Sequence, residues 1–533
     1  MTPAAVVVGA GLGGLTTATL LTRAGWRVIV LEAHVYAGGC AGTFYHQGFR
    51  FDAGATLVGG FDPGGPHALL AEWLDLTWPV RRIDPAWVVH LPTGAVTQWA
   101  DRAAWAEERR RVFPGTERFW TAQERLARTA WDLSARGLPW PPESFEDYLD
   151  LARSIRPDLI AAAPAAFQSV ASLAGSSQHD PTLGAFLDTQ LLISAQVSSD
   201  RASALYGSAA LDLPRRGVYH VPAGVGELAA TLVTWLRRHG AEVLFRQRVS
   251  RILVRQKHAV AVRTEKGLEL GADVVIANQT PWALAELLGD AAPSELRREI
   301  RSRRPTWGAF MLYLGARADA LAGIGDHHQV LLDSSQPLGE GNSVFVSISN
   351  DPGRAPKGQV AITASTHTAV EPWMALARQD PDGYRQTKQH YAERMLRALT
   401  VALPGLPTAR TFQRSASPAT FARFTGRAAG MVGGFPQTSL WTARGPGTGI
   451  KGLWLVGDSV FPGQSTAGVT LGGMRVAGAI LRCKPTRFAA STRRAQPVGR
   501  PVTLSAAGPA PDARSRRSAR GGEHREPGHT ESD

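Results

Sequence analysis

A glycine-rich turn near the amino terminus constrains the fold of this chain more than any other feature. The turn, with the sequence GAGLGG, contains Gly9, Gly11, Gly13 and Gly14. An apolar run over 4–8 predicts a buried strand before it, a helix is predicted over 15–23, and a second strand over 26–31 ends at Glu32. In such a βαβ unit the glycines allow a tight turn, a close approach of a pyrophosphate to the helix N-terminus, and close packing of helix and strand. The unit predicts a dinucleotide site with Glu32 on the adenosine ribose, and both NAD and FAD fit it.

Length and composition indicate a large globular protein. A chain of 533 residues is too long for one ordinary core, so two or more domains are expected. With only Cys40 and Cys483, there is no disulfide framework and no zinc spacing, which favours a reducing, cytoplasmic location. The first twenty residues lack the basic segment of a signal peptide. No run of about 20 apolar residues is present, so a membrane span is not expected.

The net charge of +13 is carried in part by the segment after Lys484, which is rich in Arg, Ser, Pro, Gly and Ala. Its arginines have no apolar periodicity around them, so residues 485–533 are predicted to form a disordered basic tail. Such a tail could bind an anionic leaflet, with up to about 1 kcal/mol from each well-placed basic residue, or it could be a dispensable solvated segment. Nucleic acid is not expected as a partner, because nothing resembling a nucleic-acid-binding fold accompanies the charge.

The order of predicted elements divides the chain into interleaved parts. Residues 66–216 are predicted to be largely helical, and strand–helix alternation returns over 217–285. Short strands within 286–439 suggest a separate antiparallel sheet, and a last strand and helix lie in 440–484. We therefore predict a discontinuous nucleotide-binding domain of residues 1–65, 217–285 and 440–484. The remaining ranges 66–216 and 286–439 are predicted to form a substrate domain.

Further motifs follow the first glycine turn at a distance. A second glycine-rich loop holds Gly38, Gly39 and Cys40, and a short strand leads to Gly54, Ala55 and Thr56. Near the end of the chain, an apolar strand runs into Gly457, Asp458 and Ser459, and a helix follows Gly468 and Val469. In this order, the motifs resemble those of the FAD-dependent amine oxidase and phytoene desaturase superfamily.

Within that superfamily, the string over 457–464 resembles the carotenoid desaturases and isomerases most. The strings over 38–44 and 421–427 look closest to the carotenoid 3',4'-desaturase branch. The resemblance covers about residues 4–482. It implies a p-hydroxybenzoate-hydroxylase-like fold of the α/β class, in which a discontinuous Rossmann-like FAD-binding domain is joined to a mixed α+β substrate domain.

The distant glycine–aspartate pair favours FAD over NAD. A flavin dinucleotide is long, so a second set of contacts must hold it. Asp458 can accept a hydrogen bond from a ribityl hydroxyl, and neighbouring backbone amides can hold phosphate. Val469 is predicted to start a helix whose positive dipole end faces the flavin N1–O2 edge. NAD enzymes have no need of this element.

The resemblance also assigns the smaller contacts. Gly38 and Gly39 permit close approach of the backbone to the diphosphate. Many amine oxidases continue this pair with Arg, whereas this chain has Cys40. Cys40 is either a thiol beside the flavin or, in the favoured interpretation, a small residue that fits a tight loop. Val249 matches a position whose backbone contacts adenine, and its alternative is an ordinary core valine. Gly54, Ala55 and Thr56 are expected near the flavin.

The resemblance implies desaturation of a carotenoid, with a C-3',4' double bond formed in an acyclic end of a lycopene or γ-carotene derivative. Flavin N5 accepts a hydride from an allylic C–H, a proton leaves the adjacent carbon, and oxygen or a quinone reoxidises the flavin. No catalytic base is identified. The alternatives are a redox-neutral carotenoid cis-trans isomerase using reduced FAD, a saturase or ketolase, and an amine oxidase, which Cys40 disfavours. A non-enzymatic prenyl-binding escort protein of the same fold is a further alternative, which retention of both FAD motifs disfavours.

The substrate predicts a peripheral membrane contact. Each exposed CH₂ group costs about 0.8 kcal/mol in water, so a long polyene cannot cross the aqueous phase. The low-charge helices predicted over 159–173 and 182–196 are candidates for a tunnel mouth at the bilayer, and simple core helices are the equal alternative. The pair His327-His328 has no carboxylate or Cys at ligand spacing, so we expect a solvated turn and no metal.

Overall fold

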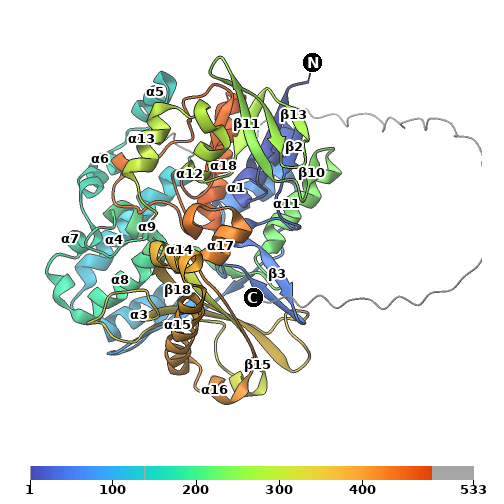
Figure 1. Ribbon diagram of the computed structural model, residues 1–533. Helices are drawn as coiled ribbons and strands as arrows, with labels where there is room; N and C mark the ends of the chain where they lie inside the picture. The colour runs from blue at the N-terminus through green and yellow to red at the C-terminus, as the bar shows by residue number, and fades with distance from the viewer. Residues whose placement is uncertain (1, 137–139, 306, 483–533) are drawn as a thin grey trace, which may run out of the picture. The chain divides into compact units, whose positions relative to one another are not determined.

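The first glycine turn follows the middle strand of a parallel five-stranded sheet. The computed structural model describes residues 2–136, 140–305 and 307–482 (Figure 1). The strand order is β10-β2-β1-β14-β20, and all neighbouring pairs are parallel. The strands are β1 (Ala4–Val8), β2 (Arg27–Leu31), β10 (Glu242–Leu244), β14 (Val274–Ala277) and β20 (Leu453–Leu455). One sheet thus unites segments from the beginning, middle and end of the chain.

Both faces of this sheet are covered, which explains its unbroken apolar strands. Val7 and Val30 pack toward α1 (Leu12–Arg23), α11 (Gly226–Arg238) and α18 (Thr466–Leu481). Their neighbours Val6 and Val8 pack toward the opposite layer. That layer consists of α12 (Pro281–Leu288), α13 (Ser294–Ser302), β11 (Val249–Arg255), β12 (His258–Thr264) and β13 (Glu269–Gly271).

A second, seven-stranded sheet has the order β19-β15-β18-β17-β16-β7-β8. Only the β16–β7 pair is parallel in it. Its strands are β7 (Trp87–Leu91), β8 (Gly94–Gln98), β15 (Trp307–Arg317), β16 (His327–Leu331), β17 (Ser343–Ser349), β18 (Gln359–Ala369) and β19 (Arg410–Ala416). One face packs on Trp373, Met395 and Leu399 of α14 (Val370–Gln379) and α15 (Pro381–Ala402). In Figure 1 these elements lie in the lower part of the molecule.

The helical prediction for 66–216 is wrong in part, because this range supplies β7 and β8 to the large sheet. In β7, Trp87, Val89 and Leu91 are buried while the residues between them are less so, which is the alternation of a half-buried strand. The same range contains β6 (Arg81–Ile83), which pairs with β9 (Val218–His220) next to β5 (Val58–Gly59).

The rest of that range is helical, as expected. Trp105 and Trp120 are buried, so the two helices that carry them each bury one face. The helices are α2 (Pro66–Leu74), α3 (Arg102–Val112), α4 (Glu117–Ala135), α5 (Phe145–Arg153), α6 (Pro157–Ala162), α7 (Val170–Ala174), α8 (Pro181–Ala195), α9 (Ala204–Leu211) and α10 (Leu213–Arg216). The remaining elements are β3 (Thr43–His46), β4 (Phe49–Asp52), α16 (Leu406–Ala409) and α17 (Pro418–Thr425).

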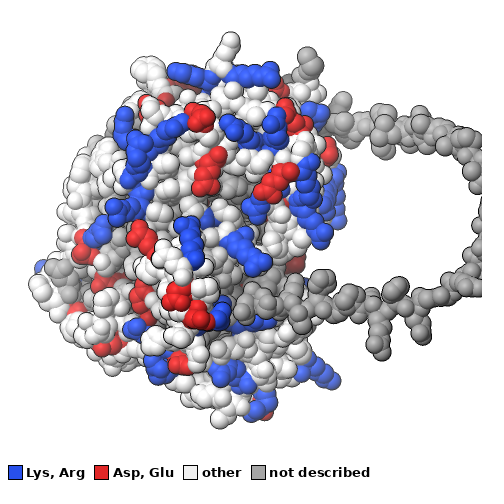
Figure 2. All heavy atoms as spheres, in the orientation of Figure 1, with Lys and Arg blue, Asp and Glu red and all other residues white. Residues whose placement is uncertain are grey.

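One prediction falls outside the described residues and another can be compared with the structure. The predicted tail over 485–533 and Cys483 lie outside the described residues. Within the described ranges, no helix combines the length and the apolar character needed to cross a membrane. On the face in Figure 2, the described Lys and Arg side chains are interspersed with Asp and Glu. The domain boundaries given above stay a prediction.

Candidate cofactor site

The first glycine turn has the geometry of a backbone cradle. Gly9 has φ +97°, and a Cβ on Gly14 would lie 2.8 Å from the Gly9 carbonyl oxygen. Helix α1 begins at Leu12, three residues earlier than predicted, because Gly11 serves as its N-cap. That cap provides no side-chain hydrogen bond, and the first turn holds no acidic residue. The first amides of α1 are therefore available for an anion, which suits the pyrophosphate of a dinucleotide.

Glu32 is fixed beside this cradle. Its Oε2 accepts a hydrogen bond from the Ala10 amide at 2.8 Å, and its Oε1 accepts one from the His34 amide at 2.7 Å. The Glu32 carbonyl accepts from the Gln247 amide at 2.8 Å, two residues before Val249. Val249 begins β11 and packs in the same core as the ends of β1 and β2. The fold therefore brings Glu32 and Val249 to the same edge of the parallel sheet.

Asn278 lies at the centre of the site, although it is not among the predicted contacts. It follows β14, its amide donates to the Val8 carbonyl at 2.9 Å, and its side chain packs against the glycines of the first turn. A Cβ on Gly11 would lie 2.3 Å from Asn278 Nδ2, and one on Gly457 would lie 3.5 Å from Asn278 Oδ1. Its place at the carboxyl end of a parallel strand is the signal that could have identified it.

The second glycine loop packs onto the first. Gly38 has φ +113°, and its amide donates to the Ala10 carbonyl at 2.9 Å. Gly39 also has a positive φ, of +57°. The Cys40 carbonyl accepts from the Ala55 amide at 3.2 Å, and a Cβ on Gly54 would lie 2.9 Å from that same oxygen. The structure thus places Gly54 and Ala55 against the Cys40 loop.

Cys40 has the environment of a packing residue. Burial raises the pKa of its thiol, and the nearby Arg427 guanidinium opposes this rise only in part. Such a thiol stays protonated near neutral pH, which favours the small-residue interpretation. Arg427, from a distant part of the chain, brings its guanidinium close to the Cys40 thiol.

The carboxyl-terminal half of the site begins where β20 ends. The Val456 amide donates to the Ala277 carbonyl at 3.0 Å, and Gly457 follows with φ +125°. Asp458 Oδ2 forms an ion pair with Arg427 Nη2 at 2.8 Å, in which both side chains are less than one-fifth exposed. Ser459 Oγ is buried and, among the described residues, has no hydrogen-bond partner. A buried orphan hydroxyl next to a glycine–aspartate turn fits a site built for a polar ligand.

Helix α18 does not start at Val469, so that prediction is wrong. It starts at Thr466, because Ser465 caps it by accepting a hydrogen bond from the Gly468 amide at 3.0 Å. The Val469 amide already donates to the Ser465 carbonyl, at 3.0 Å. The amides at the positive end of the helix therefore belong to Thr466 and Ala467. A Cβ on Gly468 would lie 2.7 Å from the Gly463 carbonyl oxygen, so glycine permits this tight approach.

The two halves of the site are joined by the packing of α1 against α18, which lie side by side in Figure 1. A Cβ on Gly473 would lie 2.5 Å from the Gly13 carbonyl oxygen, and Thr17 Oγ1 donates to the Gly473 carbonyl at 3.1 Å. A Cβ on Gly13 would lie 3.2 Å from the Val469 carbonyl oxygen. Small residues at this crossing bring motifs from opposite ends of the chain together.

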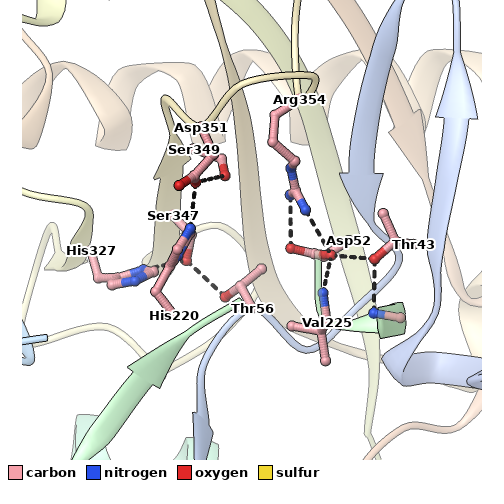
Figure 3. A network of polar contacts seen from close by, with 11 residues as sticks. Thr43, Asp52, Thr56, His220, Val225, His327, Ser347, Ser349, Asp351 and Arg354 are labelled. Atoms are coloured by element: carbon pink, nitrogen blue, oxygen red, sulfur yellow. Dashed lines mark hydrogen bonds and ion pairs between the residues drawn. The ribbon is translucent and has the colours of Figure 1, made fainter. Parts of the chain in front are cut away.

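Thr56 connects the site to the large sheet. Its Oγ1 accepts a hydrogen bond from Ser347 Oγ at 2.7 Å (Figure 3). His327 and His328 do not form the expected solvated turn: both are buried on β16, at 3 % and 5 % exposure. They point to opposite faces of the strand. His328 contacts His90, and His328 Nδ1 lies 3.2 Å from His90 Nε2. Burial lowers the pKa of both His327 and His328.

The two candidate mouth segments have different surroundings. Helix α8 packs Phe186, Leu187 and Leu191 into the core, so the core interpretation holds for it. The segment around 159–173 instead leaves Ile160 and Phe167 exposed, at 64 % and 74 %.

Comparisons with known proteins agree with this geometry. The family model described as flavin containing amine oxidoreductase matches residues 12–481. Prolycopene isomerase 1 of an Oncidium hybrid cultivar is 29 % identical, over 89 % of this chain and 83 % of its own. A lycopene-forming phytoene desaturase of Paracoccus sp. is 27 % identical, over 87 % of this chain and 94 % of its own.

Solved structures show the same fold. An oxidoreductase from Methanosarcina mazei has a TM-score of 0.61 at 20 % identity, covering 89 % of this chain and 99 % of its own. A putrescine oxidase has a TM-score of 0.59 at 16 % identity, covering 90 % of this chain and 99 % of its own. The chain belongs to the flavin containing amine oxidoreductase family, as an oxidoreductase whose cofactor is FAD.

Proposed function

We propose that this enzyme desaturates a carotenoid, introducing a C-3',4' double bond into an acyclic end of a lycopene or γ-carotene derivative. The observation that carries the proposal is the similarity to prolycopene isomerases and phytoene desaturases along most of both chains. The strings over 38–44 and 421–427 favour the 3',4' position within that group. Oxygen or a quinone is the proposed electron acceptor.

Bound FAD supplies a hydride acceptor for an allylic C–H group. The protein binds and orients the FAD. The α1 amides would hold its pyrophosphate, Glu32 would hold its ribose, and Asp458 would hold its ribityl chain. We propose as FAD contacts Gly9, Gly11, Gly13, Gly14, Glu32, Gly38, Gly39, Cys40, Gly54, Ala55, Thr56, Val249, Gly457, Asp458, Ser459, Gly468 and Val469.

Pigment analysis in a carotenoid-producing host tests the reaction. The enzyme is expressed in hosts that make lycopene, γ-carotene or their 1'-hydroxy derivatives, with the Asp458→Ala variant as the inactive control. A product two hydrogens lighter, with absorption at longer wavelength, is the expected result. An isomer of unchanged mass instead supports the second candidate, a redox-neutral cis-trans isomerase, which the similarity to prolycopene isomerases favours. Pigments identical to those of the control host contradict both.

Loss of Arg427 is expected to weaken FAD binding. The Arg427→Met variant leaves Asp458 without its ionic partner, and a hydrogen bond to a charged group contributes about 1.5–3 kcal/mol. The Kd for FAD should therefore rise about ten- to a hundredfold, measured by flavin fluorescence quenching. Arg423→Met, which removes an exposed arginine from α17, is the matched control. Equal FAD affinity in the two variants contradicts a role for Arg427.

We also propose that an apolar surface at Trp140, Phe167 and Trp441 contacts a lipid bilayer. Phe167 and Trp441 are 74 % and 60 % exposed, and their rings stack at 5.7 Å between centroids. The ring centroids of Trp140 and Trp441 lie 5.3 Å apart. Exposed aromatic side chains that gather in this way are typical of an interaction surface, and a polyene substrate has to be drawn from a membrane.

The double variant Phe167→Ser/Trp441→Ser is expected to reduce binding to phospholipid vesicles at least tenfold, because each buried aromatic side chain contributes about 1.5–3 kcal/mol. Co-sedimentation with vesicles measures the fraction of protein that binds. Val401→Ser removes a similarly exposed apolar side chain, 51 % exposed, from the end of α15 and should bind as the wild type does. Vesicle binding that is unchanged in the double variant contradicts this surface.

A further inference from the structure

Two buried imidazoles and a carboxylate converge next to Thr56, one of the proposed FAD contacts. His220 ends β9, and His327 begins β16 directly after Asp326. One ligand atom from each of these three residues lies within 4.8 Å of those of the other two. His220 and His327 are 5 % and 3 % exposed, whereas the Asp326 side chain is 39 % exposed. The group therefore has a buried side and a side open to solvent.

One nitrogen of each imidazole has a polar partner (Figure 3). His220 Nε2 pairs with the Asp351 carboxylate, which also accepts from Ser349 Oγ at 3.1 Å. His327 Nδ1 and Ser347 Oγ lie 2.8 Å apart. A carboxylate or hydroxyl behind the imidazole is the usual way in which proteins orient a histidine that binds a metal.

The second nitrogen of each imidazole has no partner among the described residues. His220 Nδ1 and His327 Nε2 are buried, and neither has a hydrogen-bond partner in the described part of the chain. A buried polar atom without a partner is costly, so native proteins rarely keep one without a ligand or a water. Two such nitrogens in one small group, beside a carboxylate, indicate that the group binds a ligand that accepts electron pairs from nitrogen and oxygen.

The charges around the group suit a cation. Asp326 and Asp351 carry two negative charges, and Arg81 supplies one positive charge, with Nη2 3.5 Å from Asp326 Oδ2. The Arg81 side chain is 55 % exposed and can turn toward solvent when another cation takes its place.

We propose that His220, His327 and Asp326 bind one divalent transition-metal ion, with the N₂O ligand set that Zn²⁺ and Co²⁺ accept. The ion would connect β9 to the large sheet, beside the Thr56–Ser347 hydrogen bond. The expectation of no metal came from the spacing around His327-His328 alone. The histidine that completes the group is His220, more than a hundred residues earlier, and His328 faces away.

Metal titration of the untagged, flavin-loaded, full-length enzyme tests the proposal. After dialysis against EDTA, Zn²⁺ is added, and bound zinc is measured by calorimetry and by elemental analysis after gel filtration. We expect one zinc per chain and a higher Tm. Asp326→Asn keeps the size of a half-exposed side chain, so this variant should fold and bind zinc at least tenfold more weakly. His327→Gln should behave in the same way, with no zinc-dependent change in Tm.

The matched control is His328→Gln, which changes the neighbouring imidazole on the opposite face of β16. It should keep wild-type zinc affinity. The proposal is overturned if the wild type retains no zinc after gel filtration. It is equally overturned if Asp326→Asn and His327→Gln bind zinc as tightly as the wild type, or if His328→Gln loses binding to the same extent. Flavin absorbance confirms that each variant is folded.

Discussion

The Arg354→Met variant is expected to lose about 3–5 kcal/mol of unfolding free energy, because it leaves a buried carboxylate without its partner. Arg354 Nη2 lies 2.9 Å from Asp52 Oδ2, with 3 % and 9 % of the two side chains exposed. Asp52 Oδ1 also accepts from the Val225 amide at 2.8 Å and from Thr43 Oγ1 at 2.6 Å (Figure 3). The pair thus ties β3, β4 and the start of α11 to the loop after β17.

Chemical denaturation followed by tryptophan fluorescence measures this loss. Arg317→Met removes an arginine that is 52 % exposed and pairs with Asp319 at 3.4 Å. That exposed pair should contribute at most about 1 kcal/mol. The double variant Asp52→Asn/Arg354→Met should be more stable than Arg354→Met alone, because the orphan charge is gone. Equal stability of the Arg354→Met and Arg317→Met variants would refute the assignment.

Gly473→Ala is expected to lose about 1–3 kcal/mol of stability and to lower FAD occupancy, because it overpacks the α1–α18 crossing. The added Cβ would lie 2.5 Å from the Gly13 carbonyl oxygen and 2.8 Å from Thr16 Cβ. The helices would have to separate, and with them the two halves of the cofactor site. Thermal unfolding and the ratio of flavin to protein absorbance provide the readouts.

The neighbouring glycine offers a matched control in the same helix. A Cβ on Gly472 meets nothing within 4 Å, so Gly472→Ala should be neutral or stabilise α18 by up to about 1 kcal/mol. If both alanine variants behave alike, the close contact at Gly473 is not what holds the two helices together.

Local signals account for what the sequence could predict. The strand, glycine turn and Glu32 lie within one short segment, and a continuous apolar strand next to glycines is distinctive. The FAD cofactor followed from adding the distant Gly457-Asp458 pair to this turn. Both features depend on residue types at short spacing, which sequence displays directly.

Partners that meet only through the fold could not be predicted. Arg427 pairs with Asp458, yet it has no local pattern that distinguishes it from other arginines. Asn278 packs against the glycine turn, and its place directly after β14 is the one signal that it offers. The start of α18 differs from the prediction because the Ser465 side chain caps the helix three residues before Gly468. His327 meets Ser347 and His220, which lie on other strands, so nothing beside it in the sequence indicates that it is buried.

The strand order of the parallel sheet has a consequence for biosynthesis. β1 and the first glycine turn leave the ribosome before β20 and α18, which lie more than 400 residues further along the chain. At roughly 5–20 residues per second, the interval between them lasts from some tens of seconds to more than a minute. During that time the nascent chain exposes the apolar face that α18 later covers. The two halves of the FAD site therefore cannot meet until α18 has been made.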